Sequence, residues 1–286
     1  MFFIKPKMMK TRIICVLLFV AAILPARAFN LHVIESPRNL GCNDTVLVYT
    51  PKVLAGEKNI PTLILLHGYS GCYRDWQSHM DLQELSDGTG FRIITPDGFY
   101  ASWYLNQAGE GTMQWRKFFW EEFWPQIDSH YGLAADKTFI SGLSMGGHGA
   151  MNIFLDYPER FRGAGSMSGV VDLKYTGGSK FLLPKLLGVE TIEDCAPESA
   201  INRLERIQER CPDWADKLLV VTCGTEDKTF VGATEDFSGR CRELGLRHIA
   251  MLSPGRHTWT YWTWVVWLHL RWFGEKIDGS PLGDGR

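Results

Sequence analysis

The chain has 286 residues, 45% of them hydrophobic, and a formal net charge of −2 at pH 7. That length suits one large α/β domain with a sizeable core, or two small domains at most. Beyond the N-terminal segment there is no basic cluster of the kind that nucleic-acid-binding proteins use, so no nucleic-acid partner is expected. Composition leaves the oligomeric state open.

Residues 1–28 have the pattern of a cleaved secretory signal peptide. A basic start is followed by an uncharged apolar run over 13–24 and then by the small-residue sequence "PARA", which ends at Ala28. The run is shorter than the ~20 residues that span a bilayer, so an uncleaved anchor is the less favoured alternative. We expect export to the periplasm or the extracellular space, and no stable membrane insertion after cleavage.

The elements that follow alternate between short apolar runs and longer amphipathic segments. This alternation predicts an α/β fold with a mostly parallel central sheet and helices on both faces. The expected strands cover 45–50, 62–67, 92–96, 138–141, 163–168, 218–224 and 248–252. The expected helices cover 118–131, the segment from 145 to Pro158, 197–210 and 258–273.

The domain boundaries follow from the same pattern. Residues 176–199 fit no strand–helix alternation and predict a loop-rich insertion over one end of the sheet. No repeat or linker divides the chain, so 29–277 is predicted to be a single domain, and 278–286 a disordered tail. Six cysteines remain after residue 28. In an exported chain they permit 15 full disulfide pairings, with plain buried thiols as the alternative, and their spacing fits no zinc site.

A glycine-rich turn carries the main chemical signal. Gly142-Leu143-Ser144-Met145-Gly146 is a G-x-S-x-G pentapeptide between an expected strand and an expected helix. In that context the motif predicts a sharp turn that exposes a serine nucleophile, with glycines where neighbouring backbone comes close. An ordinary glycine-rich loop is the alternative.

A serine nucleophile needs a histidine base and a carboxylate that orients the base. His257 lies in an expected loop between the last strand and the last helix, at the edge where open α/β sheets bind ligands. Asp227 follows the penultimate expected strand and is the predicted acid. The histidines at 148, 248 and 269 are expected to be structural, His148 as a surface or supporting residue. The alternative acids are Glu226 and, less favoured, Asp172.

Two backbone N–H groups are predicted to form an oxyanion hole. One belongs to Met145, directly after the serine, and the other to Tyr69, in the glycine-containing loop that follows the expected strand 62–67. No metal or cofactor is required by this chemistry.

Six segments together resemble the Putative esterase family of α/β-hydrolases. They are "LILLHGYSGCYRDW", "IITPDGFYASWYLN", "FFWEEFWPQIDSHYGL", "TFISGLSMGGHGAMNIFLDYPERFRGAGSMSG", "CGTEDKTF" and "PGRHTWTYW". The family includes esterase D (S-formylglutathione hydrolase), feruloyl, acetyl-xylan and tributyrin esterases, and mycolyltransferases. The resemblance implies Ser144 as nucleophile, Asp227 as acid, His257 as base, and an oxyanion hole at Tyr69 and Met145. "GRHTW" departs from relatives that have two glycines before the histidine.

The substrate is only weakly marked. Aromatic residues after the expected strand 92–96, among them Trp103 and Tyr104, could line a cleft for sugar or phenolic groups, although core packing is the alternative for each ring. We expect a small-molecule or polysaccharide-linked ester as substrate, such as an acetyl or feruloyl ester of a plant polysaccharide. The alternatives are acyl transfer to a sugar, an S-formylglutathione hydrolase-like thioesterase, which export disfavours, and a catalytically silent carbohydrate-binding protein on the same fold.

Overall fold

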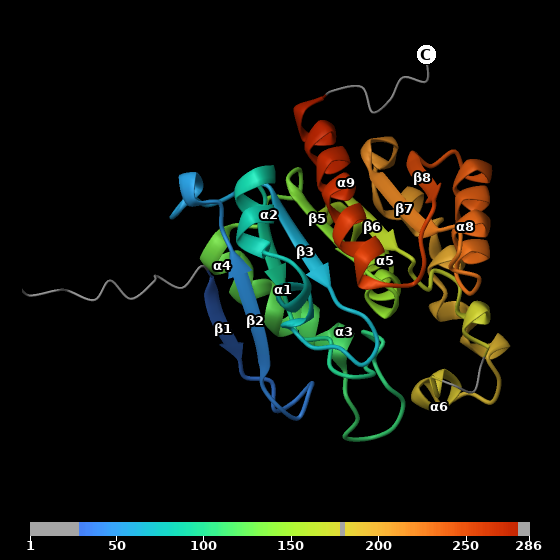
Figure 1. Cartoon of the computed structure of the whole chain (residues 1–286). Coiled ribbons are helices and arrows are strands. Elements are labelled where there is room, and N and C mark those ends of the chain that lie inside the picture. The colour runs from blue at the N-terminus through green and yellow to red at the C-terminus, as the bar shows by residue number, and fades with distance from the viewer. Residues whose placement is uncertain (1–28, 178–180, 280–286) are drawn as a thin grey trace, which may run out of the picture.

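The computed structural model describes residues 29–177 and 181–279, and these fold around one eight-stranded sheet (Figure 1). The order across the sheet is β1-β2-β4-β3-β5-β6-β7-β8. β1 and β2 are antiparallel to their neighbours, and β3 to β8 run parallel. The strands are β1 (Asn30–Ile34), β2 (Asp44–Tyr49), β3 (Thr62–Leu66), β4 (Arg92–Thr95), β5 (Thr138–Gly142), β6 (Gly163–Met167), β7 (Leu218–Gly224) and β8 (His248–Ser253).

The central strands are apolar without alternation because both faces of the sheet are covered. In β3, Leu63 and Leu65 pack into one core cluster while Ile64 and Leu66 pack into the other. All five residues of β3 are buried, which is typical of a parallel strand between two helix layers. The seven strands expected from sequence are confirmed. β1 was not expected, because this edge strand is largely exposed.

Helices form the two outer layers. α2 and α9 cover one face, together with α1, and α3, α4, α5 and α8 cover the other. The α-helices are α1 (Asp75–His79), α2 (Leu82–Thr89), α3 (Trp115–Phe118), α4 (Trp124–Tyr131), α5 (Met145–Asp156), α6 (Leu183–Leu187), α7 (Arg206–Arg210), α8 (Val231–Glu243) and α9 (Trp259–Asp278).

Three helical predictions differ from the structure in their boundaries. The segment predicted over 118–131 begins at Trp115 and contains a π-helical stretch, Phe119–Phe123, between α3 and α4. The helix predicted over 197–210 is wrong as one element, because the chain there is divided into two 3₁₀ segments and α7. The last helix continues five residues beyond its predicted end, to Asp278. The predicted tail therefore begins one residue inside α9, and most of it lies outside the described residues.

The segment over 176–199 contains no strand among its described residues. It consists of loops, α6 and the 3₁₀ helix Glu193–Glu198, and in Figure 1 α6 projects from the body of the molecule. The residues predicted to be a signal peptide lie outside the described part. The six cysteines within the described residues are free thiols, four of them buried. In the same residues, no helix is long and apolar enough to cross a membrane, and no cluster of three metal-ligating side chains is present.

α9 is held to the sheet by aromatic packing, which gives a first prediction. The rings of Phe139 on β5 and Phe273 on α9 stack with centroids 4.4 Å apart, and both side chains are fully buried. Phe273→Ala should lower the free energy of unfolding by about 3–5 kcal/mol, because it removes apolar burial and leaves a cavity. Urea denaturation followed by tryptophan fluorescence measures the change. Val53→Ala, at a side chain 90% exposed, is the control and should change stability by less than about 0.5 kcal/mol.

Candidate active site

The turn at Ser144 joins β5 to α5 in an unusual backbone conformation. Ser144 has φ 52° and ψ −119°, a region that residues with a Cβ rarely occupy. Its backbone N–H donates to the Met167 carbonyl on β6, at 3.0 Å, so the turn is tied to the neighbouring strand. The conformation is that of a nucleophile elbow, in which the serine hydroxyl stands above the carboxyl edge of the sheet.

Glycines are required on both sides of this serine. A Cβ at Gly146 would lie 2.5 Å from the His67 carbonyl oxygen, and one at Gly142 would lie 2.5 Å from the Gly146 carbonyl. Both contacts are with backbone, which cannot move aside cheaply. The glycine-rich pattern therefore reflects close approach of three backbone segments, and not a flexible loop.

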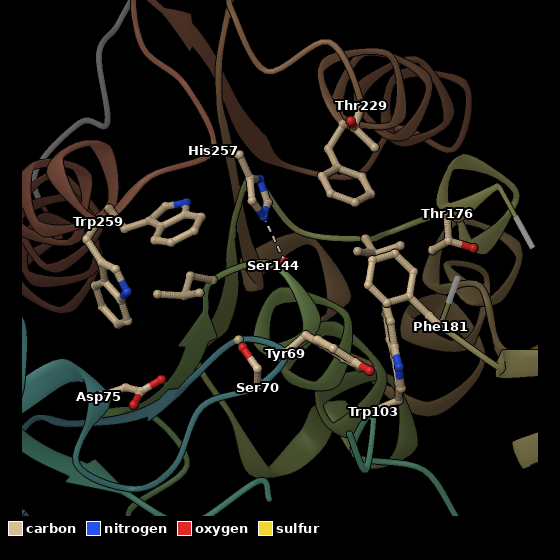
Figure 2. Close-up of a pocket in the computed structure, with 15 residues that line it drawn as sticks. Tyr69, Ser70, Asp75, Trp103, Ser144, Thr176, Phe181, Thr229, His257 and Trp259 are labelled. Atoms are coloured by element: carbon tan, nitrogen blue, oxygen red, sulfur yellow. Dashed lines mark hydrogen bonds between the residues drawn. The ribbon is translucent and has the colours of Figure 1, made fainter. Parts of the chain in front are cut away.

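Three polar side chains meet at this turn. His257 Nδ1 lies 2.7 Å from Asp227 Oδ2, and His257 Nε2 lies 3.0 Å from Ser144 Oγ (Figure 2 shows the second contact). In this arrangement Nδ1–H donates to the carboxylate while Nε2 accepts from the serine hydroxyl. The Asp227 side chain is 2% exposed and that of His257 is 32% exposed, so the base is open to a ligand and its carboxylate partner is enclosed.

The two adjacent carboxylates that sequence could not separate point in different directions. Asp227 Oδ1 accepts the Phe230 backbone N–H at 3.3 Å, which directs the carboxylate inward. Glu226 is exposed and pairs with Arg256 at 2.8 Å. Asp172, the remaining candidate, caps the 3₁₀ segment Leu173–Thr176 and pairs with Lys174. Of the three acids, Asp227 is the one within hydrogen-bond distance of His257.

The other three histidines after the motif have structural partners. His248 lies beside Ser238 Oγ, and His269 lies between two hydroxyls on β5 and β7. His148 is fully buried, and its Nδ1 lies 3.3 Å from the Val170 carbonyl oxygen. Of the two roles expected from the sequence, a surface residue or a supporting residue, the structure therefore favours the supporting one. Burial lowers the pKa of His148 and of His269 to about 3.

The predicted oxyanion donors lie where the N-terminus of α5 meets the loop after β3. In the part of the chain that the structure describes, neither the Tyr69 nor the Met145 N–H donates to a protein acceptor. The loop itself is fixed, because the Ser70 N–H donates to the Tyr100 carbonyl at 2.7 Å and the Trp76 indole donates to the Leu66 carbonyl at 3.1 Å. Two unused donors on a rigid frame suit a developing negative charge.

A cavity of about 490 Å³ opens in front of Ser144 and His257 (Figure 2). Trp103 lines it, and its predicted contact with substrate stays a prediction. Tyr104 does not belong to the lining. It is fully buried, its hydroxyl donates to the His67 carbonyl at 2.8 Å, and its ring packs against Trp115, so its predicted contact with substrate is replaced by a structural role.

Sequence reasoning missed most of the cavity wall. The lining residues that it did not single out as ligand contacts come from five separate segments, which only the folded chain brings together. They include Ser70, Asp75, Val170, Thr176, Phe181, Thr229, Phe230, Trp259 and Trp262. Six of these nine lie inside the quoted motif segments, which was the available signal, but none differs in type from an ordinary loop or helix residue: Ser70, Asp75, Thr229, Phe230, Trp259 and Trp262.

A family model described as "Putative esterase" matches residues 38–266, most of the chain. The chain belongs to the Putative esterase family. The resemblance stated from the sequence segments is thus confirmed.

Several proteins similar to this esterase-family chain are named as esterases. An esterase of Mycobacterium tuberculosis is 28% identical over 248 residues, which cover 76% of this chain and 53% of that protein, so the chain spans about half its length. An acetyl esterase of Caldicellulosiruptor saccharolyticus is 25% identical over 245 residues, covering 78% of this chain and 86% of that one. A solved ferulic acid esterase superimposes with a TM-score of 0.73 at 21% identity over 87% of this chain and 98% of its own. The shared architecture is the α/β-hydrolase fold.

The buried histidines give a prediction about pH. A histidine that protonates near pH 6.5 when unfolded, but only near pH 3 when folded, makes stability fall as pH drops from about 6.5, while above that pH its contribution is constant. Each such group adds a slope of about 1.4 kcal/mol per pH unit. His148→Gln should therefore flatten the curve of unfolding free energy against pH between 4.5 and 6 by about that slope. Identical slopes in urea titrations of the two proteins would contradict the neutral, buried state of His148.

Proposed function

We propose that this protein is a serine carboxylesterase that uses Ser144, His257 and Asp227. The observation that carries the proposal is the continuous chain of hydrogen bonds from Asp227 through His257 to Ser144 at the wall of an open cavity. Membership of the Putative esterase family supports the same reaction class. None of the proposed steps requires a metal or a cofactor.

The geometry supports a two-step acyl transfer. In the first step His257 Nε2 takes the proton of the Ser144 hydroxyl while Oγ forms a bond to the ester carbonyl carbon. The resulting imidazolium, held by Asp227, then gives its proton to the leaving alcohol oxygen as the C–O bond breaks. In the second step water attacks the acyl-serine, His257 accepts the water proton and returns it to Ser144 Oγ, and the carboxylic acid leaves.

The oxyanion of each tetrahedral intermediate would be bound by the N–H groups of Tyr69 and Met145. Both are free of other acceptors among the described residues, and Met145 is also the first residue of α5, whose N-terminus favours negative charge. Because the donors are fixed before the reaction, they need no reorganisation when the charge develops.

The proposed substrate is an acyl ester of a polysaccharide or of a smaller alcohol. Aromatic rings dominate the cavity wall, and flat rings suit phenolic acyl groups and sugar faces. Two of the relatives are named as an acetyl esterase and a ferulic acid esterase. The signal-like composition of residues 1–28 supports a location in the periplasm or outside the cell, where such esters occur.

Removing the nucleophile tests the reaction class. Ser144→Ala should keep the fold but lower kcat for p-nitrophenyl acetate by at least about 10³-fold, because no acyl-serine can form. Stopped-flow release of p-nitrophenol should show a burst in the wild type and none in the variant. A wild-type protein that hydrolyses no p-nitrophenyl acyl ester, methyl ferulate or acetylated xylan would overturn the proposal.

Paired substitutions test the acid. Asp227→Asn should lower kcat by about 10³–10⁴-fold, since the amide favours the wrong imidazole tautomer and cannot balance its charge. Glu226→Gln, one residue away and exposed, should stay within about twofold of the wild type. Initial rates at saturating p-nitrophenyl acetate measure both effects. Equal losses in the two variants would mean that the acid is assigned wrongly.

A further inference from the structure

The cavity has two sides of different character on either side of Ser144. Figure 2 shows Trp103, Phe181 and Thr176 on one side, and Asp75, Ser70 and Trp259 on the other. The first side is built from mutually packed rings, with Trp103 and Tyr69 at centroid distances of 5.3 and 5.1 Å from Phe181. We name this the aromatic side. It suits an apolar acyl group.

The opposite side carries the only carboxylate in the described cavity wall. The described lining residues include Asp75 and His257 as their titratable acid and base, with no lysine or arginine. Asp75 is half-buried and has no cationic partner among the residues that the structure describes. Among the described residues, its carboxylate accepts one side-chain hydrogen bond, from the weakly donating Cys72 thiol at 3.7 Å. The carboxylate therefore retains acceptor capacity towards a ligand.

The local backbone leaves room for this carboxylate. A Cβ at Gly71 would lie 2.0 Å from Asp75 Oδ2, although Gly71 does not have the positive φ that would by itself favour glycine. The glycine is thus explained by the space that the Asp75 side chain occupies. Any larger residue at position 71 would displace the carboxylate from the wall.

Trp259 is oriented by the same short helix that carries Asp75. Its ring stacks on His79 with centroids 3.9 Å apart and planes within 6°, and it meets Trp76 edge to face at 5.2 Å. α1 therefore supplies the carboxylate and also holds the indole beside it. We name Asp75, Ser70 and Trp259 the acidic side.

We propose that the acidic side binds the alcohol part of the ester and selects it by charge. A carboxylate beside an indole ring accepts hydrogen bonds from hydroxyl groups and attracts cations, and it repels anions. The proposal rests on the esterase function proposed above and adds to it a class of substrate: esters of neutral polyhydroxylated or cationic alcohols are favoured, and esters of anionic alcohols are disfavoured. A glutathione thioester, whose leaving thiol carries a net negative charge, belongs to the disfavoured class.

The walls strengthen this selection. Aromatic side chains exclude water and lower the local dielectric, so one unpaired charge is felt more strongly there than on an open surface. The described lining contains no lysine or arginine that could offset the negative charge of Asp75. An anionic group bound on this side would therefore be repelled by the carboxylate.

Three acetyl esters of similar size test the charge of the alcohol. Acetylcholine is cationic, 3,3-dimethylbutyl acetate is its neutral isostere, and 2-acetoxyethanesulfonate is anionic. At pH 8 the ratio of kcat/KM for the cationic ester to that for the anionic ester should fall roughly tenfold in Asp75→Asn. Intrinsic ester reactivity cancels when this ratio is compared between the two proteins, and a loss of stability alone does not change it.

A control and a second substrate pair make the outcome decisive. Asp136→Asn removes the same charge from an exposed residue before β5, at the opposite edge of the sheet from Ser144, and should leave the ratio unchanged. Ethyl hydrogen succinate and ethyl butyrate differ by charge in the acyl part, and their ratio should stay within about twofold in Asp75→Asn. Increasing salt should shrink the effect on the alcohol series.

The possible failures are distinguishable. An unchanged alcohol ratio in Asp75→Asn, with the neutral ester still hydrolysed, would overturn the charge selection and leave the esterase function standing. A change confined to the acyl series would overturn the assignment of the acidic side to the alcohol. Absence of hydrolysis of all five esters by the wild type, together with no burst from p-nitrophenyl acetate, would overturn the esterase function itself.

Discussion

The backbone conformation of Ser144 is the constraint from which the rest of the site follows. A residue with a Cβ at this φ and ψ costs about 1–3 kcal/mol, so the surrounding structure must hold it there. The hydrogen bond from the Ser144 N–H to Met167 and the close contact of Gly146 with the His67 carbonyl do so. The same contacts start α5 directly after the serine. One strained turn therefore sets the positions of the Ser144 hydroxyl and of the Met145 N–H together.

The topology of the sheet then brings the remaining groups to the same edge. Ser144 follows β5, Asp227 follows β7 and His257 follows β8, all at the carboxyl ends of parallel strands. Residues separated by more than a hundred positions in sequence can meet because the strands between them lie side by side, about 4.8 Å apart. Thr176, Phe181 and the loop after β3 complete the cavity from outside the sheet.

The strands and the meeting of Ser144, His257 and Asp227 were predictable because their signals are local. Buried parallel strands read as apolar runs, and the G-x-S-x-G turn needs its glycines for contacts within and just beside the motif. The choice between Glu226 and Asp227 needed the Phe230 N–H, which turns one carboxylate inward. Tyr104 could not be told from Trp103 by sequence, because both rings are buried and only the folded chain shows that Trp103 borders the cavity while Tyr104 does not.

The location of His257 has a further consequence. β8 is an edge strand of the sheet, and its residues are only partly buried. His257 lies on the loop that follows this strand. Edges open locally at lower free energy than the centre, where Ser144 sits after a fully buried strand. Loss of activity on warming would then reflect local unfolding of β8 and the His257 loop while the rest of the protein stays folded. The local stability of β8 and the His257 loop, more than the global free energy of unfolding, would set the temperature at which activity is lost.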